Sequence, residues 1–170
     1  MSNNLDYLNR VYLKIDLDKI CNNTKEVMKR VGKDTKVMAV VKADAYGHGA
    51  IEVSKALSEI GTYGFAVATV GEALALRRAG ITKPILILDF VFPNQFETII
   101  RNDIMLTVFR YEIAKELNEA AEQMGTTAHI HIKVDTGMGR IGYIPDDESV
   151  DEIRRIAQLP NIEIDGIFTH

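Results

Sequence analysis

The chain has only one cysteine, no excess of basic residues and no long apolar segment. Cys21 stands alone among 170 residues, which excludes a disulfide framework and a thiolate metal site. The 20 Lys and Arg residues are interspersed with 24 Asp and Glu, giving a net charge of −4, so neither a nucleic acid nor a membrane surface is an expected partner. No apolar run approaches membrane-spanning length, and residues 1–10 are polar and contain no apolar signal core. We therefore expect a cytoplasmic protein.

Hydrophobic residues make up 46% of the chain, enough for a sizeable core, and they follow two alternating periodicities. Short apolar or alternating segments predict strands at residues 11–16, 37–42, 63–68, 85–88, 104–109, 128–134 and 162–168. Apolar residues at helical spacing predict helices at 17–31, 50–60, 73–79, 112–124 and around 150–157, with a short one near 99–100. Thr69 and Glu72 have the spacing of a capping box.

The alternation of strand and helix patterns predicts an α/β fold with a parallel sheet and right-handed crossovers. We expect a (β/α)₈ TIM-type barrel, present over residues 1–170 as an incomplete barrel of about six βα units, since a full barrel takes about 250 residues. An open, doubly wound sheet is the alternative, although no G-x-G-x-x-G follows the first strand. The unpaired edge strands of a partial barrel, at 37–41 and 162–168, predict a homo-oligomer.

The segment 40–50 contains the first candidate site. An apolar strand ends at Lys42, so its amine leaves a packed interior, where a desolvated lysine is suited to condense with a carbonyl group. Gly47 and Gly49 precede a predicted helix and allow backbone to approach a ligand, and Tyr46 could donate to a phosphate. The plainer interpretation is a solvated loop lysine followed by glycines that only form a turn.

The segment 131–142 contains the second candidate site, because charged residues and glycines cluster where a strand ends. Strand alternation places on one face the residues His129, His131, Lys133 and Asp135. Arg140 follows in a glycine-rich loop, and its planar fork of donors suits an anionic oxygen of a carboxylate or phenolate. A structural Lys–Asp–Arg network that closes the barrel mouth explains the same residues equally well.

Both segments resemble alanine racemases, enzymes that bind pyridoxal 5′-phosphate (PLP). The resemblance runs through almost the whole chain and is strongest in the strings VVKADAYGHGA at 40–50, FAVATVGEA at 65–73, HIKVDTGMGRIG at 131–142 and GIFTH at 166–170. It implies a PLP-dependent isomerase that interconverts L-alanine and D-alanine, with D-alanine supplied for peptidoglycan. It also implies that residues 1–170 are an amino-terminal part of the barrel domain, without the family's carboxyl-terminal β domain, and that the isolated chain is incomplete for catalysis.

The resemblance assigns roles to individual residues. Lys42 would hold PLP through its amine and then act as a base, and Tyr46 belongs to the same cofactor motif. Arg140 would contact both the cofactor's phenolic oxygen and the substrate carboxylate. Lys133, which is carbamylated in many members, would sit beside that arginine, and His170 would pack against the pyridine ring.

Other functions share parts of this pattern. A single-domain PLP-binding homeostasis protein has the same type of barrel, and a truncated scaffold without activity is a further alternative. A metal-dependent barrel hydrolase could use His129, His131 and a carbamylated Lys133 as ligands. The histidines lie in the early half of their strand, whereas barrel catalysts lie at the carboxyl end, so we expect no metal site.

Overall fold

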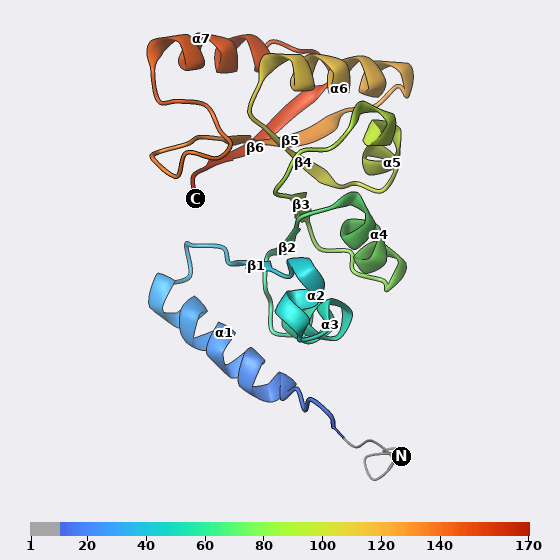
Figure 1. Ribbon diagram of the computed structural model, residues 1–170, viewed down its shortest axis with the longest axis vertical. Coiled ribbons are helices and arrows are strands. Elements are labelled where there is room, and N and C mark those ends of the chain that lie inside the picture. Colours follow the sequence, from blue (N-terminus) through green and yellow to red (C-terminus); the bar gives the residue numbers. More distant parts are fainter. Residues whose placement is uncertain (1–10) are drawn as a thin grey trace.

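The computed structural model describes residues 11–170, and within them six parallel strands form one sheet in the order β1-β2-β3-β4-β5-β6. The strands are β1 (Met38–Val40), β2 (Gly64–Val67), β3 (Ile85–Ile87), β4 (Met105–Val108), β5 (Ala128–Lys133) and β6 (Ile162–Phe168). The helices are α1 (Leu17–Val31), α2 (Lys42–Gly47), α3 (Ala50–Glu59), α4 (Val70–Arg78), α5 (Phe96–Arg101), α6 (Tyr111–Gln123) and α7 (Asp147–Ile156), with a 3₁₀ turn η2 (Pro93–Gln95). Figure 1 shows the helices from α3 to α6 following one another along the sheet in chain order.

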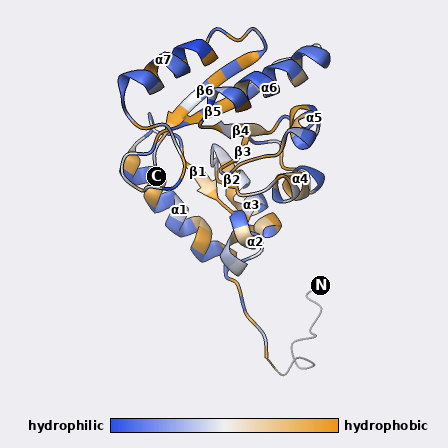
Figure 2. Ribbon diagram, turned by 45° about the horizontal axis from the view of Figure 1, so that its top comes forward, coloured by the Kyte–Doolittle hydropathy of each residue, from blue (hydrophilic) through white to orange (hydrophobic). Residues whose placement is uncertain are grey.

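Alternate strand residues point to opposite sides of the sheet, and the hydrophobic clusters on the two sides differ in size. The outer side forms a continuous core with the helices, in which Phe65, Ile85 and Leu106 are fully buried. Burial of each such side chain contributes roughly 1.5–3 kcal/mol. The inner side holds a small separate cluster of Ala66, Leu86 and Met105, to which no helix contributes. Figure 2 shows the apolar residues concentrated in the strands.

The sequential strand order and the single helical layer confirm the predicted barrel architecture. A doubly wound sheet reverses its strand order and carries helices on both faces, whereas each strand here pairs in parallel with the next one in the chain. Within the described residues, β1 and β6 therefore form the two edges of the sheet, as expected. None of the helices in residues 11–170 is long and apolar enough to cross a membrane.

Two predictions at the amino-terminal side were wrong. Residues 11–16 form no strand, because no other strand lies beside them, and Val11 and Leu13 are 87% and 77% exposed. The strand predicted at 37–42 is limited to β1 and is not buried on both faces. It lies at the sheet edge, where Val40 is 44% exposed. The prediction for residues 1–10 falls outside the described part of the chain.

The last strand contains a β-bulge that the alternating pattern does not reveal. Its pairing with β5 shifts between Ile130 and His131, so Ile164 pairs with Ile130 while Gly166 pairs with His131. The extra residue, Asp165, reverses the alternation. Ile164 packs on the helical core, whereas Phe168 packs on the inner cluster. The bulge therefore turns the end of the chain toward the barrel interior.

Candidate functional site

The predicted site residues meet in one cavity at the carboxyl ends of the strands. This cavity has a volume of about 110 Å³, and its wall consists of Lys42, Ala68, Leu88, Asp89, Lys133, Arg140, Ile141, Phe168 and His170. The turn after β1 contributes Lys42, the end of β5 contributes Lys133, and the following loop contributes Arg140. Catalytic groups of parallel barrels occupy this end of the sheet. The structure thus brings together four of the five predicted site residues.

Tyr46 is the exception among the five. It belongs to the same turn as Lys42, but its side chain is 62% exposed and does not line the cavity. The predicted phosphate contact through this hydroxyl therefore stays a prediction. His170 lines the cavity although it is itself exposed.

The chain around Lys42 forms a left-handed helical turn, where the sequence analysis predicted a strand end and a loop. Four consecutive residues, Ala43 to Tyr46, have φ between 51° and 55° and ψ between 38° and 49°. None of them is glycine, and left-handed helical backbone costs roughly 1–2 kcal/mol per residue. Such a run persists only where surrounding contacts impose it. Gly47 and Gly49, with φ of 85° and 89°, then lead into α3.

Several contacts hold this turn in place. The backbone N–H of Ala45 donates to the carbonyl of Val41 at 2.9 Å, and the carboxylate of Asp44 accepts from the N–H of Ala50 at 2.7 Å, at the start of α3. His48 bonds through Nδ1 to the carbonyl of Ala45 at 2.8 Å. The backbone that carries the Lys42 side chain is therefore held by hydrogen bonds, and the side chain itself is half-buried.

Lys133 is a buried cation without an acidic partner among residues 11–170. It is 3% exposed, its Nζ donates to the carbonyl of Val134 at 2.8 Å, and the same atom lies 5.5 Å from the ring centroid of Phe168. No carboxylate oxygen of the described residues lies within ion-pair distance. Burial of an ammonium group is costly unless a counter-charge or hydrogen bonds compensate it.

Asp135 shapes the loop that carries Arg140. Its carboxylate accepts hydrogen bonds from the backbone N–H groups of Gly137, Gly139 and Arg140 at 2.9, 3.0 and 2.9 Å. These bonds, foremost that from Gly139, lower the pKa of Asp135 below its ordinary value of 3.8. The alternative interpretation, a structural Lys–Asp–Arg network, does not hold for Asp135, because its carboxylate binds backbone rather than the side chains of Lys133 or Arg140. The signal that the sequence offered was an aspartate followed by glycines, which favours such a turn.

Arg140 itself combines a fixed backbone with an open side chain. The bond from its N–H to Asp135 anchors the residue, while the residue is exposed and lines the cavity. Its guanidinium has no acceptor among residues 11–170, and such a group at a cavity wall suits an anionic oxygen of a ligand. The sequence analysis predicted an anion-binding role for the Arg140 side chain, but not the anchoring of its backbone by Asp135.

The two histidines of β5 lie away from this cavity, as their position in the strand predicted. His129 contacts the carboxylate of Asp165 through Nδ1 at 3.1 Å, and these two residues and Glu163 each offer one metal-ligating atom within 4.8 Å of the others. His131 instead packs its ring edge-on against Phe168, with centroids 6.2 Å apart. Burial lowers the pKa of His131, and the nearby charge of Asp165 partly opposes this shift.

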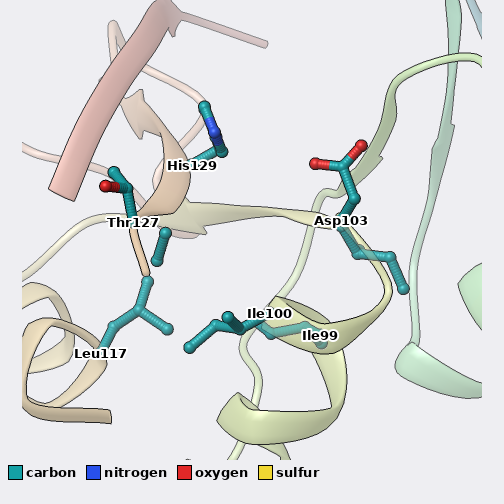
Figure 3. Close-up of a pocket in the computed structure, with 8 residues that line it drawn as sticks. Ile99, Ile100, Asp103, Leu117, Thr127 and His129 are labelled. Atoms are coloured by element: carbon teal, nitrogen blue, oxygen red, sulfur yellow. The ribbon is translucent and has the colours of Figure 1, made fainter. Parts of the chain in front are cut away.

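A second, smaller cavity lies at the opposite end of the strands. It has a volume of about 20 Å³, which is room for about one water molecule. Figure 3 shows Asp103 and His129 on one side of it and the apolar side chains of Ile99, Ile100 and Leu117 on the other. Its size excludes an organic substrate. The cavity at the carboxyl ends of the strands is the candidate site because four of the predicted residues line it.

Comparison with known proteins gives matches over nearly the whole chain. The family model described as the N-terminal domain of alanine racemases matches residues 15–170. An alanine racemase from Clostridium tetani is 48% identical over 164 residues, covering 96% of this chain and 42% of the relative. One from Methanococcus maripaludis is 49% identical over 160 residues, covering 94% and 43%.

Solved structures agree with the sequence matches. The structure of the alanine racemase of Clostridium difficile 630 in complex with cycloserine superposes with a TM-score of 0.86 at 44% identity. The match covers 91% of this chain and 42% of that one. The chain thus spans about two fifths of the length of the relatives it matches.

Proposed function

The chain belongs to the family of alanine racemase N-terminal domains, and from this we propose that the protein interconverts L-alanine and D-alanine with PLP as cofactor. The observation that carries the proposal is the convergence of Lys42, Arg140 and His170 on one cavity at the carboxyl ends of the strands. The matches to alanine racemases do not favour the metal-dependent hydrolase or the homeostasis protein.

The chemistry of the cavity wall fits PLP. The amine of Lys42 can condense with the aldehyde, the guanidinium of Arg140 can bind an anionic oxygen, and the ring of His170 can pack on an aromatic ligand. When bound, PLP supplies an electron sink that makes the Cα proton of an amino acid acidic. In this proposal Lys42 holds the cofactor and then moves that proton on one face of Cα.

Arg140 has a positioning role in the proposed reaction. Because its backbone is fixed by Asp135 while its side chain remains free to bind, it can orient the substrate carboxylate without taking part in proton transfer. The hydroxyl of Tyr46, which lies in the same turn as Lys42, would reach a phosphate group of the bound cofactor. Supply of D-alanine for peptidoglycan, a cytoplasmic location and a homo-oligomeric state belong to the same proposal.

We also propose that Lys133 is carbamylated. Reaction of its neutral amine with carbon dioxide forms a carbamate and releases a proton, which turns a buried cation without a carboxylate partner among residues 11–170 into an anion that can pair with Arg140. The support is the burial of the Lys133 amine without a carboxylate partner in the described residues. A ¹³C carbamate resonance after incubation with labelled bicarbonate, absent in Lys133→Met, is the expected result.

The function is tested by trapping the cofactor-bearing lysine. The full-length protein is incubated with PLP, reduced with borohydride and digested, and the modified peptide is located by mass spectrometry. We expect the pyridoxyl group on Lys42, loss of the adduct and of D-alanine formation in Lys42→Ala, and no change in Lys55→Ala, which removes an exposed lysine of α3. A pyridoxyl group on another lysine, or D-alanine formation that survives Lys42→Ala, would contradict the assignment.

A further inference from the structure

Glu72 connects the candidate site to the start of α4, and its carboxylate accepts more hydrogen bonds than a helix cap requires. One carboxylate oxygen accepts from the backbone N–H groups of Ala68 and Thr69 at 2.7 and 3.1 Å, and Thr69 Oγ1 in turn accepts from the N–H of Glu72 at 3.2 Å. The reciprocal pair with Thr69 is the capping box that the sequence predicted. The other carboxylate oxygen accepts from the N–H of Ala43 at 2.7 Å, 29 residues away in the chain.

We propose that Glu72 is a positioning residue that holds the left-handed turn of Lys42, an inference that rests on the proposed function. Ala43 directly follows Lys42 and is the first of the four residues with left-handed backbone. Its N–H lies at the entrance of the turn, where the carboxylate of Glu72 is its hydrogen-bond partner. The bond therefore fixes the peptide from which the side chain of Lys42 departs, and with it the direction of the amine.

The other contacts of the turn act at different points and do not replace this one. Asp44 bonds to the start of α3, and the N–H of Ala45 bonds to the carbonyl of Val41. Both contacts close the turn on its own neighbours in the chain. Before Lys42, the N–H of Val41 bonds to the carbonyl of Ala66 in β2 at 2.8 Å. After Lys42, Glu72 ties the peptide of Ala43 to the β2–α4 connection.

A carboxylate is needed for this bridge because three N–H donors share two acceptor oxygens. A glutamine of the same length has one acceptor oxygen and one donor amide. It can therefore satisfy either Ala43 or the pair formed by Ala68 and Thr69, and its NH₂ group then faces the remaining N–H. Because two of the three donors belong to the capping position, we expect the amide oxygen to stay with Ala68 and Thr69 and the NH₂ group to face Ala43. Glu72→Gln thus removes the bridge and keeps the cap, with little change in volume.

The matched control is Thr69→Ala. It removes the Oγ1 acceptor of the capping box and weakens the start of α4, yet leaves the carboxylate and its bond to Ala43 in place. A role limited to capping predicts similar effects of Thr69→Ala and Glu72→Gln. The proposed positioning role predicts that only Glu72→Gln affects the turn.

The experiment uses the full-length protein and two readouts. The first is amide hydrogen exchange at Ala43 without PLP, and the second is the fraction of Lys42 that carries a pyridoxyl group after borohydride reduction at limiting PLP. In Glu72→Gln we expect exchange at Ala43 at least about tenfold faster, since a hydrogen bond to a charged group is lost, and a lower Lys42 fraction. In Thr69→Ala we expect both values to stay within about twofold of the parent.

Unchanged values in Glu72→Gln, or equal changes in both variants, would overturn the proposal. If the parent protein forms no adduct at Lys42, the proposed function fails, and exchange at Ala43 alone then decides the role of Glu72. If Glu72→Gln does not fold, Glu72→Asp replaces it, because a side chain one methylene shorter keeps the charge but loses the reach to Ala43. Fast exchange at Ala43 in the folded Asp variant supports the proposal, and parent-like exchange overturns it.

Discussion

Replacement of Gly166 by alanine tests how closely β6 packs against the strand that carries Lys133. A Cβ atom built on Gly166 would lie 2.8 Å from both Cε1 and Nδ1 of the His131 ring, closer than real Cβ contacts come. The ring also packs against Phe168, with the centroids 6.2 Å apart, so a shift of the ring away from the new methyl group changes this contact. Phe168 in turn forms part of the cavity wall. The added methyl group must therefore displace a side chain that supports the site.

Two opposing terms set the expected magnitude. Gly166 lacks the positive φ that would forbid alanine, so the substitution gains about 0.4–1 kcal/mol by restricting the unfolded chain. Overpacking of a well-filled region costs about 1–3 kcal/mol. We expect the second term to prevail, with a net loss of about 1–2 kcal/mol in the free energy of unfolding.

Urea denaturation followed by circular dichroism measures this loss, and two variants make the interpretation specific. Gly71→Ala adds a methyl group that meets only Thr69 Oγ1, at 3.9 Å, so it should stabilise the protein. In a His131→Ala background the clash disappears, and Gly166→Ala should become neutral or stabilising. Gly166→Ala that is as stable as the parent, or equally harmful in both backgrounds, would refute the proposed contact.

Three further predictions concern individual basic residues. Arg77 donates to the carbonyls of Ile81, Lys83, Asn102 and Asp103, and Arg77→Lys, which lacks the planar fork, should cost about 2–4 kcal/mol in chemical denaturation. Because the pKa of His131 is lowered in the folded state, the unfolded state binds more protons, and the free energy of unfolding should fall as the pH drops below about 6.5. Chemical denaturation at about pH 7.5 and 5.5 measures this fall, which should be smaller in His131→Gln. Arg140→Lys should lower kcat/KM for alanine by at least about tenfold, whereas the exposed Arg154→Lys should leave it unchanged.

The sequence predicted the barrel because on every strand the outward residues pack against the helices and the inward residues face the barrel interior. Residues such as Phe65 and Ile85 face the helical layer, and their inward neighbours Ala66 and Leu86 face the interior, so the pattern and the architecture carry the same information. The resemblance to alanine racemases implied the cluster of Lys42, Lys133 and Arg140, and the fold accounts for it, since carboxyl ends of parallel strands share one edge.

Features imposed by distant contacts escaped prediction. The left-handed turn contains no glycine between Ala43 and Tyr46, and local preference alone favours right-handed backbone there. Its cause lies partly in Glu72, a residue of another βα unit. The bulge at Asp165 adds one residue to a strand that looks regular, and residues 11–16 have a strand-like pattern without a neighbouring strand. Such features depend on partners that a local pattern does not contain.

The carboxylates around the cavity have a common arrangement that determines its electrostatic character. Glu72 and Asp135 each accept three backbone N–H groups, and Asp89, which lines the cavity, accepts the N–H of Phe90 at 2.8 Å. These carboxylates accept hydrogen bonds from backbone N–H groups of the loops, while the side chains of Lys42 and Arg140 line the cavity. Because acids that shape the loops do not neutralise these cations, the cavity favours an anionic ligand, as a cofactor phosphate or an amino-acid carboxylate requires.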